Sequence, residues 1–270
     1  LCKLHIHLKE VFELLIHSMK LMQEPFNKIK NQTKTIEVRL YDEKRQQVQV
    51  GDFIEFSLMD NAKVKLQVVV TNLYRFSSFD ELYKNLSKEK LGYLPNEIID
   101  ANCMNVYYST EKQSMYDAFA IEFRLTDLQK FIDAQNDGYG FGQTYKVALD
   151  ELKHGRKVSH WIWYVFPQID GLGWSSTTKY FSIKNLQEAI DYYNHPVLHA
   201  RLIEITSELL NSKFDNFMYI FGYPDAYKVR SCMTLFNYAI SNNNLFRQVI
   251  DKFCRGLEDN DTIKILQSIH

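Results

Sequence analysis

The first half of the chain shows the alternation of apolar and polar residues that is typical of half-buried strands. In the segment 34–40, Ile36, Val38 and Leu40 share one face, while Glu37 and Arg39 lie on the other. Four segments are short, alternate in this way and are rich in β-branched and aromatic residues: 34–40, 51–58, 65–76 and 118–125. Between the last two strands, Ser78 followed by Glu81 is a capping pattern that predicts a helix over 77–86.

From Thr126 onward the apolar residues recur at helical spacing. The pattern predicts helices over 126–135, 144–155, 182–194, 196–211 and 243–257. Thr126, Ser182 and Asn243 are candidate N-caps, and Pro196 suits a first helical position. The change of period predicts an α+β protein with a β domain at 19–125 and an all-helical domain at 126–270, joined without a linker.

The first 18 residues allow two interpretations. Leu4, Leu8, Phe12 and Leu15 recur at helical spacing and predict a short amphipathic helix. Alternatively, residues 1–18 are an extension upstream of Met19, which opens the first recognisable domain. Charged residues interrupt the apolar stretch, so we expect no export signal.

Charge and composition narrow the classes of function. The net charge of -1 gives the whole protein no electrostatic reason to bind nucleic acid, so any such binding requires a local patch. Residues 20–45 hold seven basic side chains and four acidic ones: Lys20, Lys28, Lys30, Lys34, Arg39, Lys44 and Arg45 against Glu24, Glu37, Asp42 and Glu43. The segment is therefore the candidate patch.

The four cysteines stand far apart, without zinc-ligand spacing. We therefore expect reduced thiols in a cytoplasmic protein, with no metal site and no cofactor. No stretch reaches the roughly 18 uncharged apolar residues of a membrane span, so we expect a soluble protein. Nothing in the sequence identifies a protein partner.

The N-terminal half resembles the ASCH family. The resemblance rests on Pro25-Phe26, the strand 34–39, the Gly51-Asp52 turn and the later segments SFDELY, LGY, YYST and FAIEF, and it covers residues 19–125. One departure is Gln32, where the family commonly has glycine. ASCH domains resemble PUA domains, which implies a PUA-like β-barrel with a cleft for RNA or a small nucleotide.

The resemblance places Lys34, Glu37 and Arg39 in that cleft. Basic side chains there suit phosphates, while Tyr41 or Phe26 could stack on a base. We therefore predict a protein that binds RNA or a modified nucleotide. The alternative is that most of these charged side chains lie on a solvent-exposed surface and bind no ligand.

A hydrolase acting on a modified nucleoside or nucleotide is the alternative function. Some ASCH proteins resemble a small amidohydrolase that uses a lysine, a threonine three positions on, and a distant glutamate. Lys34 matches that lysine, but Glu37 occupies the threonine position. A carboxylate beside a lysine could activate water, so the sequence leaves open whether the protein is an enzyme.

The helical half resembles a multihelical family of unknown function that has been labelled calpastatin-like. The resemblance rests on DLQKFIDAQ, ALDELKHGRKVSHWIWYVFPQIDGLG, HPVLHARL and FGYPDAYKVRSCMTLF, and it implies no established reaction. The candidate ligand-binding residues are Ser159, His160, Trp163, Gln168, Lys228 and Arg230. We expect the SHWIWYVFPQ and DAYKVRS segments to meet across a pocket for a nucleotide-like or ADP-ribose-like ligand. The alternative is that Trp161, Trp163 and Phe166 form the core and His160 is a packing residue.

Overall fold

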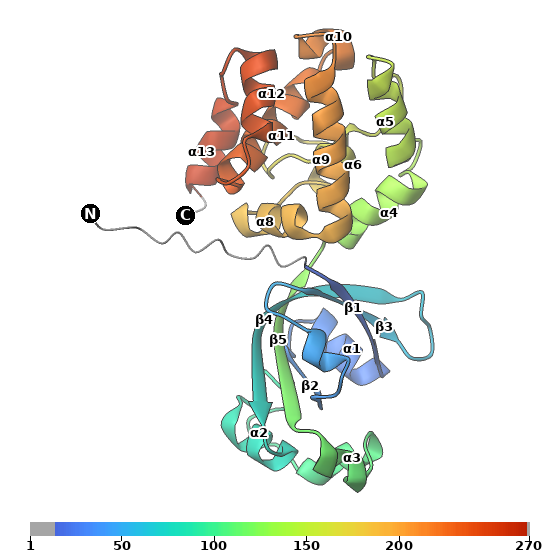
Figure 1. Cartoon of the computed structure of the whole chain (residues 1–270), viewed down its shortest axis with the longest axis vertical. Helices are drawn as coiled ribbons and strands as arrows, with labels where there is room; N and C mark the ends of the chain where they lie inside the picture. Colours follow the sequence, from blue (N-terminus) through green and yellow to red (C-terminus); the bar gives the residue numbers. More distant parts are fainter. Residues whose placement is uncertain (1–13, 269–270) are drawn as a thin grey trace, which may run out of the picture. The chain divides into compact units, whose positions relative to one another are not determined.

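The computed structural model describes residues 14–268, which fall into two compact units that divide between Leu125 and Thr126 (Figure 1). The first unit is built on a sheet and the second on helices. The predicted α+β class is therefore confirmed.

Within residues 14–125, the first unit is built on a curled, half-barrel sheet of five strands. The strands are β1 (Ile16–Leu21), β2 (Ile36–Leu40), β3 (Phe53–Leu58), β4 (Lys65–Phe76) and β5 (Ala118–Thr126). Their order is β1-β3-β4-β5-β2, with β1 parallel to β3 and with the β3–β4 and β2–β5 pairs antiparallel. All four strands predicted from alternation are present.

Strand β1 corrects the interpretation of residues 14–18. They do not stand outside the first domain, because Ile16 pairs with Phe53 and the strand runs on to Leu21. Most of the helix predicted through Leu4, Leu8, Phe12 and Leu15 lies outside the described residues, and Leu15, which is described, is not helical but leads directly into β1.

Asp52 fixes this parallel strand to the sheet. Its buried carboxylate accepts hydrogen bonds from the backbone N–H of Leu15 at 3.0 Å and of Gln49 at 2.9 Å, and it lies 2.7 Å from Nε2 of His17. All three groups contact the same carboxylate, because the Gly51-Asp52 turn places the Asp52 side chain beside the start of β1.

We predict that Asp52→Ala destabilises the first unit by about 2 kcal/mol, because it leaves two partly buried N–H donors without their acceptor. Hydrogen exchange of the β1 and β3 amides would measure this loss. Asp60→Ala removes an exposed carboxylate that forms no hydrogen bond or ion pair within 14–268, and it should have almost no effect. Equal protection in the two variants would contradict the role given to Asp52.

Apolar layers cover both faces of the sheet. One layer contains Ile54, Phe56 and Ile121, and helix α1 (Gln23–Lys30) adds Phe26 and Ile29 to it. The other layer joins the apolar residues of β2 to helix α2 (Phe79–Asn85) and the 3₁₀ segment η2 (Ala101–Val106). Because Ile36, Val38 and Leu40 lie in this second layer, Glu37 and Arg39 point to the opposite side.

The local signals in the first unit are partly confirmed. Ser78 caps α2 by accepting a hydrogen bond from the N–H of Glu81, as predicted. Helices α1 and α3 (Thr110–Met115), by contrast, were not predicted.

Helices and loops build the second unit. The helices are α4 (Gln129–Asp137), α5 (Tyr145–Lys153), α6 (Ile162–Val165), α7 (Ser176–Tyr180), α8 (Leu186–Asn194), α9 (Pro196–Asn211), α10 (Phe217–Phe221), α11 (Asp225–Ala239), α12 (Leu245–Cys254) and α13 (Asn260–Ser268). Large aromatic side chains fill the interior, with Trp161, Tyr164 and Tyr192 almost completely buried. None of the helices within 14–268 is long and apolar enough to cross a membrane.

The helix starts predicted for this unit are partly confirmed. Pro196 does open α9. Thr126 is not a cap, because strand β5 continues through it and α4 begins at Gln129. Asn243 accepts a hydrogen bond from the N–H of Leu245, although the cap position itself is Asn244.

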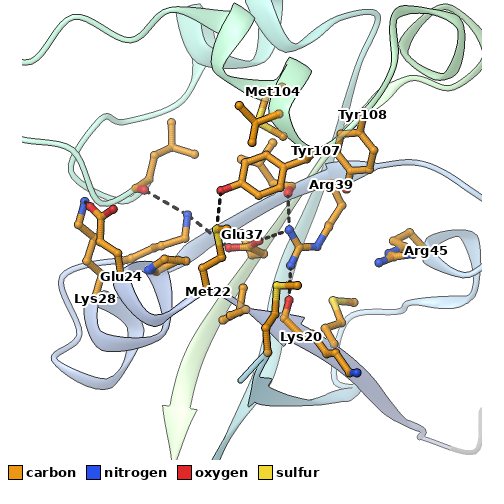
Figure 2. Close-up of a pocket in the computed structure, with 18 of the residues that line it drawn as sticks. Lys20, Met22, Glu24, Lys28, Glu37, Arg39, Arg45, Met104, Tyr107 and Tyr108 are labelled. Atoms are coloured by element: carbon orange, nitrogen blue, oxygen red, sulfur yellow. Dashed lines mark hydrogen bonds and ion pairs between the residues drawn. The ribbon is translucent and has the colours of Figure 1, made fainter. Parts of the chain in front are cut away.

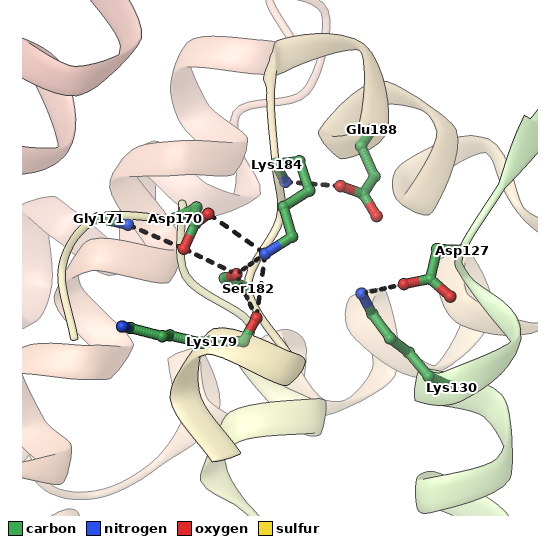
Figure 3. Close-up of polar contacts among 8 residues, drawn as sticks. All are labelled: Asp127, Lys130, Asp170, Gly171, Lys179, Ser182, Lys184 and Glu188. Carbon is green, nitrogen blue, oxygen red and sulfur yellow. Dashed lines mark hydrogen bonds and ion pairs between the residues drawn. The ribbon is translucent and has the colours of Figure 1, made fainter. Parts of the chain in front are cut away.

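Ser182 is not a cap either, because its hydroxyl serves the preceding loop. Its Oγ lies within hydrogen-bond distance of the carboxylate of Asp170 and of the carbonyl of Lys179, and Nζ of Lys184 also contacts these groups (Figure 3). Helix α8 is capped three residues later by Asn185, which accepts from the N–H of Glu188. A local pattern cannot reveal that Asp170 competes for the hydroxyl.

Candidate functional site

A cleft of about 1010 Å³ opens in the first unit beside Glu37 and Arg39 (Figure 2). Its lining comes from β1, α1, β2 and the segments 44–47 and 83–108, with Met59 after β3, and these parts are far apart in the sequence. The charged lining consists of six basic and two acidic side chains: Lys20, Lys28, Lys34, Arg39, Lys44 and Arg45 with Glu24 and Glu37. The cleft is therefore basic, although the whole chain is nearly neutral.

Glu37 lies at the centre of the cleft and contacts two cations. Its Oε1 lies 2.6 Å from Nη1 of Arg39, and its Oε2 lies 3.4 Å from Nζ of Lys34. Lys34 also donates to the carbonyl of Leu91, and Arg39 donates to the carbonyl of Lys20 on β1 (Figure 2). The structure thus brings together all three residues that the ASCH resemblance placed in the cleft.

Burial lowers the pKa of Lys34, and the positive charges of Arg39 and Lys28 act in the same direction. The hydrogen bond and the negative charge of Glu37 oppose this shift. Because one carboxylate serves two cations, the centre has an excess of positive charge. A ligand anion beside Lys34 would favour its charged form.

Four further basic side chains lie at the rim of the cleft, and within 14–268 two of them form ion pairs while two do not. Lys28 pairs with Glu24 at 2.8 Å, and Arg45 pairs with Asp42 at 2.9 Å. Lys20 and Lys44, by contrast, are exposed and form no ion pair with any other residue in 14–268. These two ammonium groups are free to contact phosphates.

Tyrosine and methionine side chains form the apolar wall. Tyr107 and Met22 are each about half exposed, and the hydroxyl of Tyr107 donates to Sδ of Met22 at 3.4 Å (Figure 2). Nζ of Lys28 lies 5.7 Å from the ring centre of Tyr93, and Tyr83 contacts the same ring edge to face. A planar base could pack against this wall.

The aromatic residues of the cleft differ from those predicted. Phe26 is buried in the core, and Tyr41 packs on Phe119 with their ring centres 5.0 Å apart, so neither lines the cleft. Tyr93 and Tyr107 lie in the LGY and YYST segments, which supported the family resemblance but carried no predicted role. Proximity to Lys34 comes only from the folding of the segment 83–108 over β2.

In the helical unit, the structure separates the predicted ligand-binding residues. Lys228 and Trp163 do meet, with Nζ of Lys228 4.7 Å from the ring centre. Arg230 instead donates to the carbonyls of Leu257 and Glu258, and His160 is exposed. The alternative reading also needs correction, because Trp161 is buried whereas Trp163 is only half-buried and His160 is no packing residue.

The other two predicted residues of this unit bond through their backbones. The N–H of Ser159 donates to the carboxylate of Glu151, and the carbonyl of Gln168 accepts from the N–H of Ile183. Both contacts use backbone groups, so neither contact positions the side chain of Ser159 or Gln168 for a ligand. Within 14–268, no cluster of three His, Cys, Asp or Glu side chains could hold a metal ion.

Comparison with known proteins assigns the two halves. Residues 19–127 match the ASCH domain, a PUA-like RNA-binding fold, so the chain carries a fold that fits a general role in RNA binding. Residues 125–266 match the family described as "Protein of unknown function (DUF1810)". The chain therefore belongs to the DUF1810 family, with an ASCH domain fused to it. The calpastatin-like label is not supported.

Three solved structures are similar to parts of this chain. The conserved hypothetical protein Rv1873 from Mycobacterium tuberculosis is 38% identical, with 52% of this chain and 96% of that chain covered and a TM-score of 0.49. The hypothetical protein PH0355 is 32% identical, covering 41% and 99% at a TM-score of 0.35. The protein PF0455 from Pyrococcus furiosus is 31% identical, covering 42% and 98% at a TM-score of 0.31. No curated protein matches the chain.

Proposed function

We propose that the protein binds RNA or a modified nucleotide in the cleft of its ASCH domain. The observation that supports this most strongly is the excess of basic over acidic side chains in one cleft of a chain whose net charge is -1. Lys20 and Lys44 contact phosphates, and an unstacked base enters beside Tyr107 towards Lys34 and Glu37. Sequence-specific RNA readout commonly uses such splayed bases.

The geometry favours binding over hydrolysis. Both oxygens of Glu37 already contact cations, and Glu37 occupies the position where the amidohydrolase pattern has threonine. Glu37 therefore serves as the anchor that holds Lys34 and Arg39 in place. The hydrolase alternative is therefore not supported.

We predict that binding of single-stranded RNA falls steeply with salt, because each phosphate contact releases counterions and adds about -0.7 to the slope of log K against log salt. The double variant Lys20→Ala, Lys44→Ala removes two contacts and should make the slope shallower by about 1.4. Fluorescence anisotropy of a labelled RNA across a salt series measures both quantities.

The matched control is Lys63→Ala with Lys112→Ala, which removes two exposed lysines of the same domain that do not line the cleft. The control should keep the slope of the unmodified protein. An equal loss in both double variants would show diffuse attraction and contradict binding in the cleft. Absence of binding to any RNA or nucleotide would overturn the proposed function.

A further inference from the structure

Two nearly buried lysines in the helical unit share a single carboxylate. Asp225, the first residue of α11, lies 2.7 Å from Nζ of Lys157 and 2.8 Å from Nζ of Lys228. The exposed fractions of the side chains are 9% for Lys157, 18% for Lys228 and 15% for Asp225. One positive charge therefore stays uncompensated in a place that is poorly hydrated.

Asp225 remains a carboxylate in this setting. Burial alone would raise the pKa of Asp225, but hydrogen bonds and charges from Lys157 and Lys228 outweigh it and lower the pKa. The cluster thus carries two ammonium groups and one carboxylate at neutral pH. An uncompensated buried charge is costly, and a bound anion would offset that cost.

The fold satisfies other cations of this unit in a different way. Lys252 donates to two main-chain carbonyls, and Lys184 donates to a carboxylate, a hydroxyl and a carbonyl (Figure 3). Arg230 also donates to two carbonyls. The ammonium groups of Lys157 and Lys228, in contrast, have no hydrogen-bond acceptor within 14–268 except Asp225, so most of their ammonium N–H donors have no protein partner.

Aromatic rings lie over both ammonium groups, with Nζ of Lys157 5.5 Å from the ring centre of buried Trp161. Nζ of Lys228 lies 4.7 Å from the ring centre of half-buried Trp163. Tyr223 and Tyr227 flank Asp225 in sequence, are 79% and 57% exposed, and contact each other edge to face at 6.0 Å. The N-terminus of the 15-residue helix α11 adds partial positive charge beside the ammonium groups.

We infer that Lys157, Lys228, Trp163 and Tyr227 form a second ligand site, in the helical unit, for a small phosphorylated molecule of the nucleotide type. The phosphate binds to the unused donors of the two lysines. The base packs against the exposed ring of Tyr227. This site is separate from the ASCH cleft and does not depend on the function proposed for that cleft.

Titration of the full chain with ADP, inorganic pyrophosphate and adenosine tests the inference. All three tryptophans lie in the helical unit, so a phosphate beside Trp163 should change tryptophan fluorescence, and calorimetry gives the affinity. We expect ADP to bind more tightly than pyrophosphate, and adenosine to bind at least about tenfold more weakly than ADP. If neither ADP nor pyrophosphate changes the fluorescence or gives a heat of binding, the inferred site is wrong.

Variants locate the binding. Lys157→Met leaves a neutral pair of Asp225 and Lys228 and should weaken ADP at least about tenfold, whereas Lys228→Arg keeps the charge and should retain binding. The matched control is Lys213→Met, which removes an exposed lysine that also lies over a ring, 5.3 Å from the centre of Phe214, and has no carboxylate partner. Thermal unfolding of each variant separates lost binding from lost folding.

The ASCH cleft provides the second comparison. ADP binding should persist in the Lys20→Ala, Lys44→Ala variant, because those residues belong to the other unit. Loss of ADP binding there, with full binding in Lys157→Met, would assign the nucleotide to the ASCH cleft and overturn the inferred site. Failure of RNA binding alone would leave the ADP result unchanged.

Discussion

Replacement of Glu37 by alanine is expected to destabilise the first unit by about 3–5 kcal/mol, because Lys34 and Arg39 would lose their shared counter-charge in a buried site. The Glu37 side chain is only 6% exposed, and those of Lys34 and Arg39 are 11% and 15% exposed, so water replaces the lost contacts poorly. Hydrogen exchange of the β2 and β5 amides measures the loss. Tryptophan fluorescence reports the helical unit alone and should not change.

The matched control is Glu55→Ala on strand β3. Glu55 pairs with Lys65 at 2.8 Å, but Lys65 is 41% exposed, so this change should cost less than about 1 kcal/mol. Adding Lys34→Met to the Glu37→Ala variant should recover part of the stability, because it removes one of the two unpaired charges. Similar losses from Glu37→Ala and Glu55→Ala would contradict the anchoring role of Glu37.

Acidification is expected to destabilise the helical unit by about 3 kcal/mol through His195 alone. Burial lowers the pKa of His195 to about 4, from an ordinary value of 6.5. The unfolded chain therefore takes up a proton near pH 6.5, while the folded chain resists until about pH 4. Stability is fully present above pH 6.5, falls as the pH drops through this window, and levels off below it.

The structure explains the resistance to protonation. His195 is completely buried, and its Nδ1 accepts a hydrogen bond from the N–H of Leu198 at the start of α9. A proton on Nδ1 would remove that cap. His195→Asn keeps a side chain that can accept this bond and removes the titration.

Chemical unfolding followed by tryptophan fluorescence at several pH values checks this prediction. Between pH 7 and pH 4, the unfolding free energy of the unmodified protein should fall by about 3 kcal/mol relative to that of His195→Asn. His160→Asn changes an exposed histidine of the same unit and should leave the pH profile unaltered. Parallel profiles for His195→Asn and the unmodified protein would show that His195 does not supply the pH dependence.

Much of the secondary structure could be predicted because its signals are local. Alternation in 34–40 and 51–58 directs side chains to two faces, and the Ser78 cap needs only Glu81 three residues later. Strand β1 was missed, because its alternation spans only a few residues and its parallel partner β3 lies more than thirty residues away. Ser182 was misjudged for a similar reason, since its competitor Asp170 is not a local neighbour in the cap pattern.

The sequence by itself determined the class of each half, the concentration of basic residues in 20–45, and the spacing that sets Glu37 and Arg39 on one face of a strand. Only the tertiary structure decided which groups meet: Arg39 reaches the carbonyl of Lys20, and the segment 83–108 supplies the tyrosines of the cleft. In the helical unit, the tertiary structure brings Lys157 to Asp225, whereas Arg230 donates to main-chain carbonyls elsewhere. The periodicity of a strand or helix fixes the direction of a side chain, whereas its partner depends on packing between segments distant in the chain.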